Sequence, residues 1–288
     1  MIESKKTNEG HVLHKICRVL VADRSPIVRS AVRRGISVYK DQRYLDVIFV
    51  EDGIEALKIF QAKRVDVAFV DIDLPGLSGP KLVSELKTTL SNNCLTIAMS
   101  GEPDSTTEAV LEEFGAYHLL RKPFKAQDVA DIFMTYLIMT NIYRILVVDD
   151  SSTMRKVARD ILKRSRFRYE FTEADSALNA LKAIEAERPH MILTDFHMPD
   201  VDGLELAGMI SDLSKRIDIY MMSTSDTDHL ERSAAFVGIS GFLKKPFTAE
   251  DIDCIMHKRL GLDRPKFGKT RPMFAFLERP VESDQVFL

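Results

Sequence analysis

The chain has 288 residues, of which 45% are hydrophobic and 29% are charged, so we expect about two folded domains and not a disordered or fibrous protein. Its 40 basic and 43 acidic side chains leave a formal net charge of −3 with no long block of one sign, so neither nucleic acid nor a membrane surface is an expected partner. The longest apolar runs are far shorter than the roughly 20 residues that span a bilayer, and the N-terminus has no secretory pattern, so we expect a cytoplasmic protein.

Along the first half of the chain, short apolar runs alternate with segments of helical periodicity. This is the pattern of βαβ units around a parallel sheet. The predicted strands lie near residues 19–22, 47–50, 67–70, 96–99 and 118–120. The predicted helices begin near Pro26, Gly53, Ser78, Ser105 and Ala126.

The second half repeats the same alternation. Its predicted strands lie near residues 145–148, 169–171, 191–194, 219–222 and 242–243. Its predicted helices begin near Ser152, Ser176, Asp202, Thr227 and Ala249. Five β/α units in each half predict an α/β fold in which two tandem flavodoxin-like domains each have a doubly wound parallel sheet of order 2-1-3-4-5.

The two halves are also similar in sequence, which indicates an internal duplication. Residues 18–29 match 144–155, residues 65–79 match 190–203, and residues 119–124 match 242–247, with matched positions 123 to 127 residues apart. The last stretch carries Pro265, Pro272 and Pro280 and has no clear periodicity, so we expect it to be extended. The predicted organisation is an N-terminal tail (1–16), a first domain (17–141), a second domain (143–260) and a C-terminal tail (261–288).

Four charged side chains of the second copy follow predicted strands. Asp149 and Asp150 follow the first strand, Asp195 ends the third and Lys245 follows the fifth. Ligands of such folds bind at the carboxyl ends of the strands, so these groups are expected to converge. Three carboxylates so close together repel one another, and Mg²⁺ is the natural compensating ion because it prefers carboxylate oxygens and phosphate. The pattern therefore favours Mg²⁺-assisted phosphoryl chemistry on a carboxylate.

These residues resemble the CheY-like receiver domain of two-component response regulators. The resemblance rests on the paired acids, the D-x-x-[ML]-P-x-x-x-G block, a small hydroxyl after the fourth strand and the KPF block, in that order. It implies that Asp195 is the phospho-acceptor and that Mg²⁺ (or Mn²⁺) is held by Asp149, Asp150, Asp195 and the backbone carbonyl of His197. It also implies that Lys245 binds the phosphoryl group, that Ser223 is the switch hydroxyl, with Thr224 as the alternative, and that Phe242 is the aromatic ring that turns inward on phosphorylation.

The first copy carries the same resemblance with two departures. It keeps the acceptor Asp71, the lysine Lys122 and the hydroxyl Ser100, and its metal ligands would be Asp23, Asp71 and Asp73. In this interpretation Ala22 replaces the first acid of the pair and leaves Asp23 alone, so we expect weaker metal binding. Leu119 replaces the switch aromatic. Two readings stay open, a working receiver and a degenerate one that is kept as an interaction module.

By the same resemblance, the chain is a phosphorelay response regulator that is phosphorylated by a histidine kinase or a histidine phosphotransfer protein. Only 28 residues follow Leu260, too few for a DNA-binding or cyclase domain, so we expect the signal to pass to a protein target that the sequence does not identify. The apolar helix near 132–139 is a candidate for contact between the domains or between two copies of the chain.

Two alternatives to this function remain. A phosphate sink or relay member would use the flow of phosphoryl groups as its output. The pair Asp71 and Asp73 also suggests an aspartate-nucleophile phosphatase of the haloacid dehalogenase type. We disfavour that enzyme because its acid pair follows the first strand, and because the second copy has His197 in place of the second acid. We therefore expect no enzymatic activity beyond autophosphorylation and autodephosphorylation.

Overall fold

The computed structural model describes residues 16–39, 45–89, 94–213, 217–224, 237–262 and 267. These residues form two compact units. The first unit contains the described residues up to Tyr136 together with Phe267, and the second contains those from Leu137 to Leu262. The expected helix at Thr227 lies outside the described residues. So do both expected tails, except Ile16, Gly261, Leu262 and Phe267.

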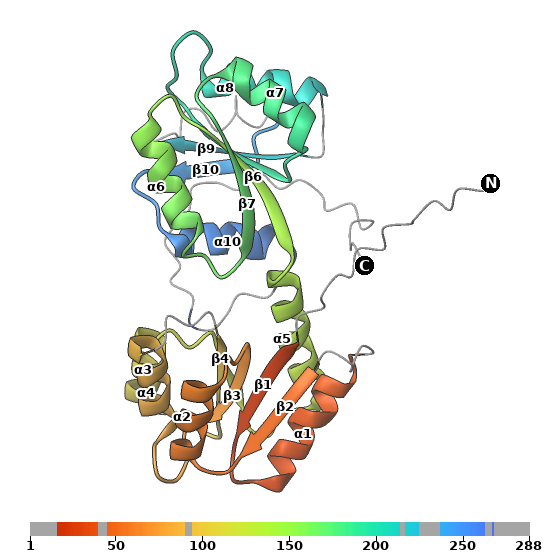
Figure 1. Cartoon of the computed structure of the whole chain (residues 1–288), viewed down its shortest axis with the longest axis vertical. Coiled ribbons are helices and arrows are strands. Elements are labelled where there is room, and N and C mark those ends of the chain that lie inside the picture. The colour runs from red at the N-terminus through yellow and green to blue at the C-terminus, as the bar shows by residue number, and fades with distance from the viewer. Residues whose placement is uncertain are drawn as a thin grey trace, which may run out of the picture. The chain divides into compact units, whose positions relative to one another are not determined.

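The first unit is a five-stranded parallel sheet covered by helices on both faces. Its strands run in the order β2-β1-β3-β4-β5, and all of the pairs are parallel. Helices α1 and α5 cover one face of the sheet, and α2, α3 and α4 cover the other (Figure 1). The strands are β1 (Cys17–Ala22), β2 (Leu45–Val50), β3 (Val67–Asp71), β4 (Leu95–Ser100) and β5 (His118–Arg121), and the helices are α1 (Pro26–Ser37), α2 (Gly53–Ala62), α3 (Gly79–Thr89), α4 (Ser105–Glu113) and α5 (Ala126–Met139).

The second unit has the same topology. Its strand order, β10-β9-β8-β6-β7, is the first unit's order written from the opposite edge, and all of its pairs are parallel. The predicted sheet order is therefore confirmed for both copies. The strands are β6 (Ile142–Val148), β7 (Arg168–Ala174), β8 (Met191–Asp195), β9 (Asp218–Ser223) and β10 (Gly241–Lys244), and the described helices are α6 (Ser152–Leu162), α7 (Ala177–Glu187), α8 (Gly203–Leu213) and α10 (Ala249–Arg259).

The predicted starts of the described helices are correct to within one residue. Proline or a capping side chain marks several of these starts, because a capping side chain accepts a hydrogen bond from a free backbone N–H group of the first turn and proline has no such group. Ser25 caps α1 by accepting a hydrogen bond from Val28 N, and Ser151 caps α6 by accepting one from Met154 N. No helix within the described ranges is long and apolar enough to cross a membrane.

The central strands explain why the chemistry gathers at one edge of each sheet. β3 is buried along its whole length, as a strand with helices on both of its faces must be. Because every strand of a unit runs in the same direction, the residues that follow β1, β3 and β5 lie along one edge, as do those that follow β6, β8 and β10. Polar residues that are excluded from the middle of these strands come together there.

Candidate functional site

Asp149 is the most firmly held acid of the second unit. It directly follows β6, and its side chain is 1% exposed. Its Oδ1 accepts a hydrogen bond from Ser151 N at 2.9 Å, and its carbonyl oxygen accepts one from Arg155 at 2.7 Å. Its own N–H donates to the carbonyl oxygen of Ala174 at 3.2 Å. These contacts fix the direction of the carboxylate before any ligand arrives.

Asp195 is the last residue of β8 and is more accessible than Asp149. Its Oδ1 accepts hydrogen bonds from Phe196 N and from Lys245 Nζ, both at 2.9 Å. No hydrogen bond to its Oδ2 occurs within the described part of the chain. A Cβ atom at Gly203 would collide with the carbonyl oxygen of Asp195, so glycine allows α8 to begin close behind Asp195.

Lys245 connects the two carboxylates. It directly follows β10, and its Nζ lies 2.9 Å from Asp149 Oδ2 and 2.9 Å from Asp195 Oδ1. Burial lowers the pKa of Lys245, but hydrogen bonds and the charges of the two aspartates outweigh burial and raise its pKa above the ordinary value. The lysine therefore remains a cation at neutral pH.

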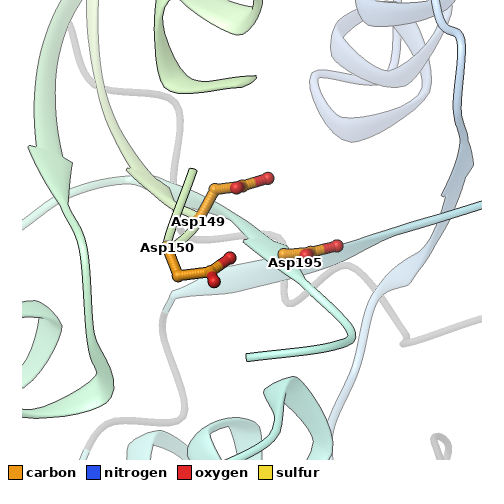
Figure 2. A group of neighbouring side chains, drawn as sticks. All are labelled: Asp149, Asp150 and Asp195. Atoms are coloured by element: carbon orange, nitrogen blue, oxygen red, sulfur yellow. The ribbon is translucent and has the colours of Figure 1, made fainter. Parts of the chain in front are cut away.

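Asp150 completes a group of three acids (Figure 2). Oxygen atoms of Asp149, Asp150 and Asp195 lie within 4.8 Å of one another, and Asp150 is the exposed member. Three carboxylates face one ammonium group, so the cluster keeps an excess of negative charge. A divalent cation that prefers oxygen ligands fits this donor set, and Mg²⁺ also leaves coordination positions for water and phosphate.

The other expected residues of the second unit lie around this group of acids. His197 is exposed in the loop between β8 and α8, where its ring packs edge-on against Phe196. Ser223 is buried at the end of β9, and its carbonyl oxygen accepts a hydrogen bond from Lys245 N at 2.7 Å, whereas Thr224 is exposed. The roles that we expect for these residues remain predictions.

Phe242 is already turned inward in this structure. Its side chain is 3% exposed and belongs to the hydrophobic core of the second unit. It lies on β10 opposite Met221 of β9. In this conformation the Phe242 ring is therefore not in the outward position from which the predicted inward turn would start.

The first unit repeats the contacts of Asp149 at Asp23, which corrects the sequence alignment. Asp23 Oδ1 accepts a hydrogen bond from Ser25 N at 2.7 Å, and the Asp23 carbonyl oxygen accepts one from Arg29 at 2.7 Å. Asp23 is therefore the counterpart of Asp149, and the next residue, the exposed Arg24, is the counterpart of Asp150. The interpretation that Ala22 replaces an acid is wrong, because Ala22 is a buried residue of β1.

Lys122 reproduces the position of Lys245. Its Nζ lies 2.7 Å from Asp23 Oδ2 and 2.9 Å from Asp71 Oδ1, and its N–H donates to the carbonyl oxygen of the buried Ser100 at 2.6 Å. Asp23 Oδ2 is buried and lacks a partner with hydrogen-bond geometry among the described residues, so its contact with Lys122 is an ion pair without a hydrogen bond.

The acids of the first unit do not form the three-carboxylate group of the second. Asp73 is exposed, and its N–H donates to Asp71 Oδ1 at 3.4 Å. Among the described residues, the one group of three acids close enough to share an ion is that of Asp149, Asp150 and Asp195. Asp23 and Asp71 therefore meet at Lys122, but the carboxylate of Asp73 does not join them in a group of three.

Leu119 takes the place of Phe242 on the fifth strand of the first unit. It is 4% exposed and pairs with Ala98 of β4. The ring of Phe267, which is distant in sequence, is partly buried against the small core cluster that contains Leu119, Ala98 and Leu111. An aromatic side chain thus reaches this part of the first unit from outside the fifth strand.

Sequence analysis missed a buried polar cluster in the second unit, away from the acids. Ser165 Oγ donates to Asp253 Oδ1 at 2.5 Å, Arg166 N donates to the same carboxylate at 3.1 Å, and a His257 ring nitrogen lies 2.6 Å from the Asp253 carbonyl oxygen. Burial, only partly offset by these partners, raises the pKa of Asp253 to about 6. The signal that could have revealed the cluster is two polar residues four apart, Asp253 and His257, on the buried face of α10.

Comparison with known proteins agrees with this geometry. The family model described as the response regulator receiver domain matches residues 19–133 and again residues 145–256. Chemotaxis protein CheY-3 of Vibrio cholerae is 32% identical over 108 residues, which is 37% of this chain and 82% of that protein. Chemotaxis protein CheY of Bacillus subtilis is 29% identical over 118 residues, 41% of this chain and 98% of that protein.

Two solved structures extend the similarity across both units. Both proteins are named as two-component system response regulator/GGDEF domain proteins, with TM-scores of 0.57 and 0.55 and identities of 22% and 24%. Each match covers 85% of this chain and 98% of the other chain. At these identities the likeness concerns the fold alone.

Proposed function

The chain belongs to the response regulator receiver domain family, with one receiver domain in each unit, and from this premise we propose that Mg²⁺-dependent phosphorylation of Asp195 carries its signal. Receiver 1 is the first unit and receiver 2 is the second. The observation that supports the proposal is the group formed by Asp149, Asp150, Asp195 and Lys245, in which three carboxylates face one ammonium group.

The reaction is a phosphoryl transfer from a histidine kinase or a histidine phosphotransfer protein. Asp195 Oδ2 attacks the phosphorus atom, the new P–O bond forms, and the P–N bond to the donor imidazole breaks with its electron pair on the nitrogen. Lys245 and the Ser223 hydroxyl hold phosphoryl oxygens, and bound Mg²⁺ supplies the charge neutralisation that lets two negative groups approach. Asp149 and Asp150 hold the ion, with Asp195 and the His197 carbonyl oxygen as its further protein ligands.

The phosphoryl group then biases the surface that a partner protein recognises. It brings nearly two negative charges and three acceptor oxygens to the end of β8. Lys245 gives up its contact with the Asp195 carboxylate and pairs with the phosphoryl group, and Ser223 turns toward it at the end of β9. A partner that prefers one arrangement of β9, β10 and α10 then reads the phosphorylation state.

One observation favours the alternative function, a phosphate sink or relay member. Phe242 is already buried, so phosphorylation has no outward ring to turn inward. Hydrogen exchange with and without beryllofluoride separates the two functions. A binding switch changes the exchange of backbone amides in β9, β10 and α10, whereas a pure sink leaves them unchanged.

The decisive experiment counts phosphoryl groups. The full chain is treated with acetyl phosphate and Mg²⁺, and its intact mass is measured for the wild type, Asp195→Asn and Asp71→Asn. We expect one phosphoryl group on the wild type, none on Asp195→Asn and one on Asp71→Asn. A chain that loses its label in Asp71→Asn but keeps it in Asp195→Asn contradicts the assignment of the acceptor.

A further inference from the structure

We infer that Arg24, which holds the backbone place of Asp150, deprives receiver 1 of a metal ligand and adds a positive charge there, so that metal binding is confined to receiver 2. The inference rests on the proposed magnesium site of receiver 2. It goes beyond that site because it assigns a role to a residue that the reaction at Asp195 does not use. It also predicts that one exposed position decides whether a receiver of this chain binds a metal.

The correspondence between Arg24 and Asp150 depends on matched contacts on both sides of each residue. On one side, Asp23 and Asp149 donate their N–H groups to the end of the neighbouring strand, to Val50 O at 3.1 Å and Ala174 O at 3.2 Å. On the other side, Ser25 and Ser151 cap the helices that follow. One residue lies between each aspartate and its serine, so Arg24 and Asp150 hold the same place in the backbone.

The charges around the two acceptors differ as a result. In receiver 2, Lys245 bridges Asp149 and Asp195, and oxygens of Asp149, Asp150 and Asp195 lie within 4.8 Å of one another. In receiver 1, Lys122 Nζ lies 2.7 Å from Asp23 and 2.9 Å from Asp71, and the exposed Arg24 brings a positive charge to the position at which receiver 2 has Asp150. Receiver 1 therefore carries less negative charge than receiver 2, even with Asp73 counted, because Arg24 stands where receiver 2 has an acid.

Arg24 is free to act in this way. Its side chain is exposed, and within the part of the chain that the structure describes it forms no ion pair or hydrogen bond. A guanidinium group is always protonated, offers only donors and cannot ligate a metal ion. At the position of Asp150 an arginine supplies no carboxylate ligand, and its positive charge also opposes the binding of a divalent ion.

Counting bound Mn²⁺ on the full chain tests the inference. Mn²⁺ is paramagnetic and prefers the same oxygen ligands as Mg²⁺, so free and bound ions are distinguished by electron paramagnetic resonance. We expect the wild type to bind one ion and Asp150→Arg to bind none. We expect Arg24→Asp to bind two, and the double variant Arg24→Asp/Asp150→Arg to bind one, now in receiver 1.

The matched control is Arg24→Met, which removes the positive charge without adding an oxygen ligand and should still bind one ion. A wild type that binds two ions, or an Arg24→Asp variant that binds only one while its circular dichroism spectrum stays native, overturns the inference. A wild type that binds no ion, like Asp150→Arg, instead overturns the metal site of the proposed function. The two failures are therefore distinguishable.

Discussion

Receiver 1 and receiver 2 share the contacts of the aspartates and the lysine at the strand ends but differ at exposed positions next to them. Asp23 and Asp149 have the same backbone partners, and Lys122 and Lys245 bridge the same pair of carboxylates. The differences fall on exposed residues such as Arg24 against Asp150 and Asp73 against His197. An aspartate and a lysine at the ends of strands are thus part of the fold, and their presence alone does not indicate a working metal site.

The first prediction compares how tightly the loop between β3 and α3 of receiver 1, and the matching loop of receiver 2, pack against the helix that follows the second strand. Gly53 begins α2, donates its N–H to Pro75 O at 3.0 Å, and has no room for a Cβ beside the Leu77 carbonyl group. Its counterpart at the start of α7 is Ala177. We expect Gly53→Ala to destabilise receiver 1 by about 3 kcal/mol, because backbone must move to relieve the clash.

The matched control is Ala177→Gly in receiver 2, for which we expect a loss of about 1 kcal/mol or less. Hydrogen exchange of the full chain, followed on peptides from β1 and β2 and on peptides from β6 and β7, assigns each effect to its receiver. Equal losses in the two variants would show that the loops pack alike, contrary to the comparison.

Sequence reasoning predicted the sheet order, the strands and the described helix starts, because buried strands and helix caps leave strong local patterns. It also identified the acids and lysines at the strand ends. It misaligned the first copy by one residue, because the single Asp23 was matched with Asp150 and not with Asp149. A pair of aspartates in one copy and a single aspartate in the other are compatible with either match. Ser25 with Ser151 and Arg29 with Arg155, equally spaced behind Asp23 and Asp149, would have fixed the register.

The buried polar cluster could not be predicted in the same way, because its partners are far apart in the sequence. Ser165 and Asp253 are separated by 88 residues and are brought together only by the tertiary fold. In receiver 1 the position of Asp253 on the last helix is taken by Ala130, and the aromatic pair Tyr39 and Phe133, with ring centroids 5.9 Å apart, packs nearby. The apolar periodicity of a helix shows which face is buried, but it does not show that a polar residue such as Asp253 is buried on that face.

The second prediction uses this difference and concerns pH. The pKa of Asp253 is raised from 3.8 to about 6, so the folded state holds this proton more tightly than the unfolded state does. Stability of receiver 2 therefore falls as the pH rises from about 4 to 6, by at most about 2 to 3 kcal/mol from this group. Receiver 1, with Ala130 at the matched position, has no such contribution from that position.

Asp253→Asn should remove this dependence and stabilise receiver 2 at pH 7, because an amide oxygen still accepts the hydrogen bonds from Ser165 and Arg166. Hydrogen exchange at pH 5 and pH 7, corrected for intrinsic exchange rates, measures the effect on each receiver. If Asp253→Asn destabilises receiver 2 equally at both pH values, the carboxylate contributes through its charge and the prediction is wrong.

The smallest expected effect bears most directly on the difference between the receivers. Without divalent ions, Asp150→Asn should stabilise receiver 2 by about 1 kcal/mol, because it relieves the repulsion among three carboxylates near the surface. With saturating Mg²⁺ the sign should reverse, since the wild type gains the free energy of ion binding to its folded state and the variant loses a ligand.

Arg24→Asp should show the opposite response in receiver 1, with a loss of stability in EDTA that Mg²⁺ restores. Hydrogen exchange of β6 and β1 with and without Mg²⁺ follows both variants. If Mg²⁺ does not change the stability of Arg24→Asp, or does not reverse the effect of Asp150→Asn, the aspartate at that position is not a metal ligand. The response to Mg²⁺ therefore distinguishes ion binding from a simple change of charge.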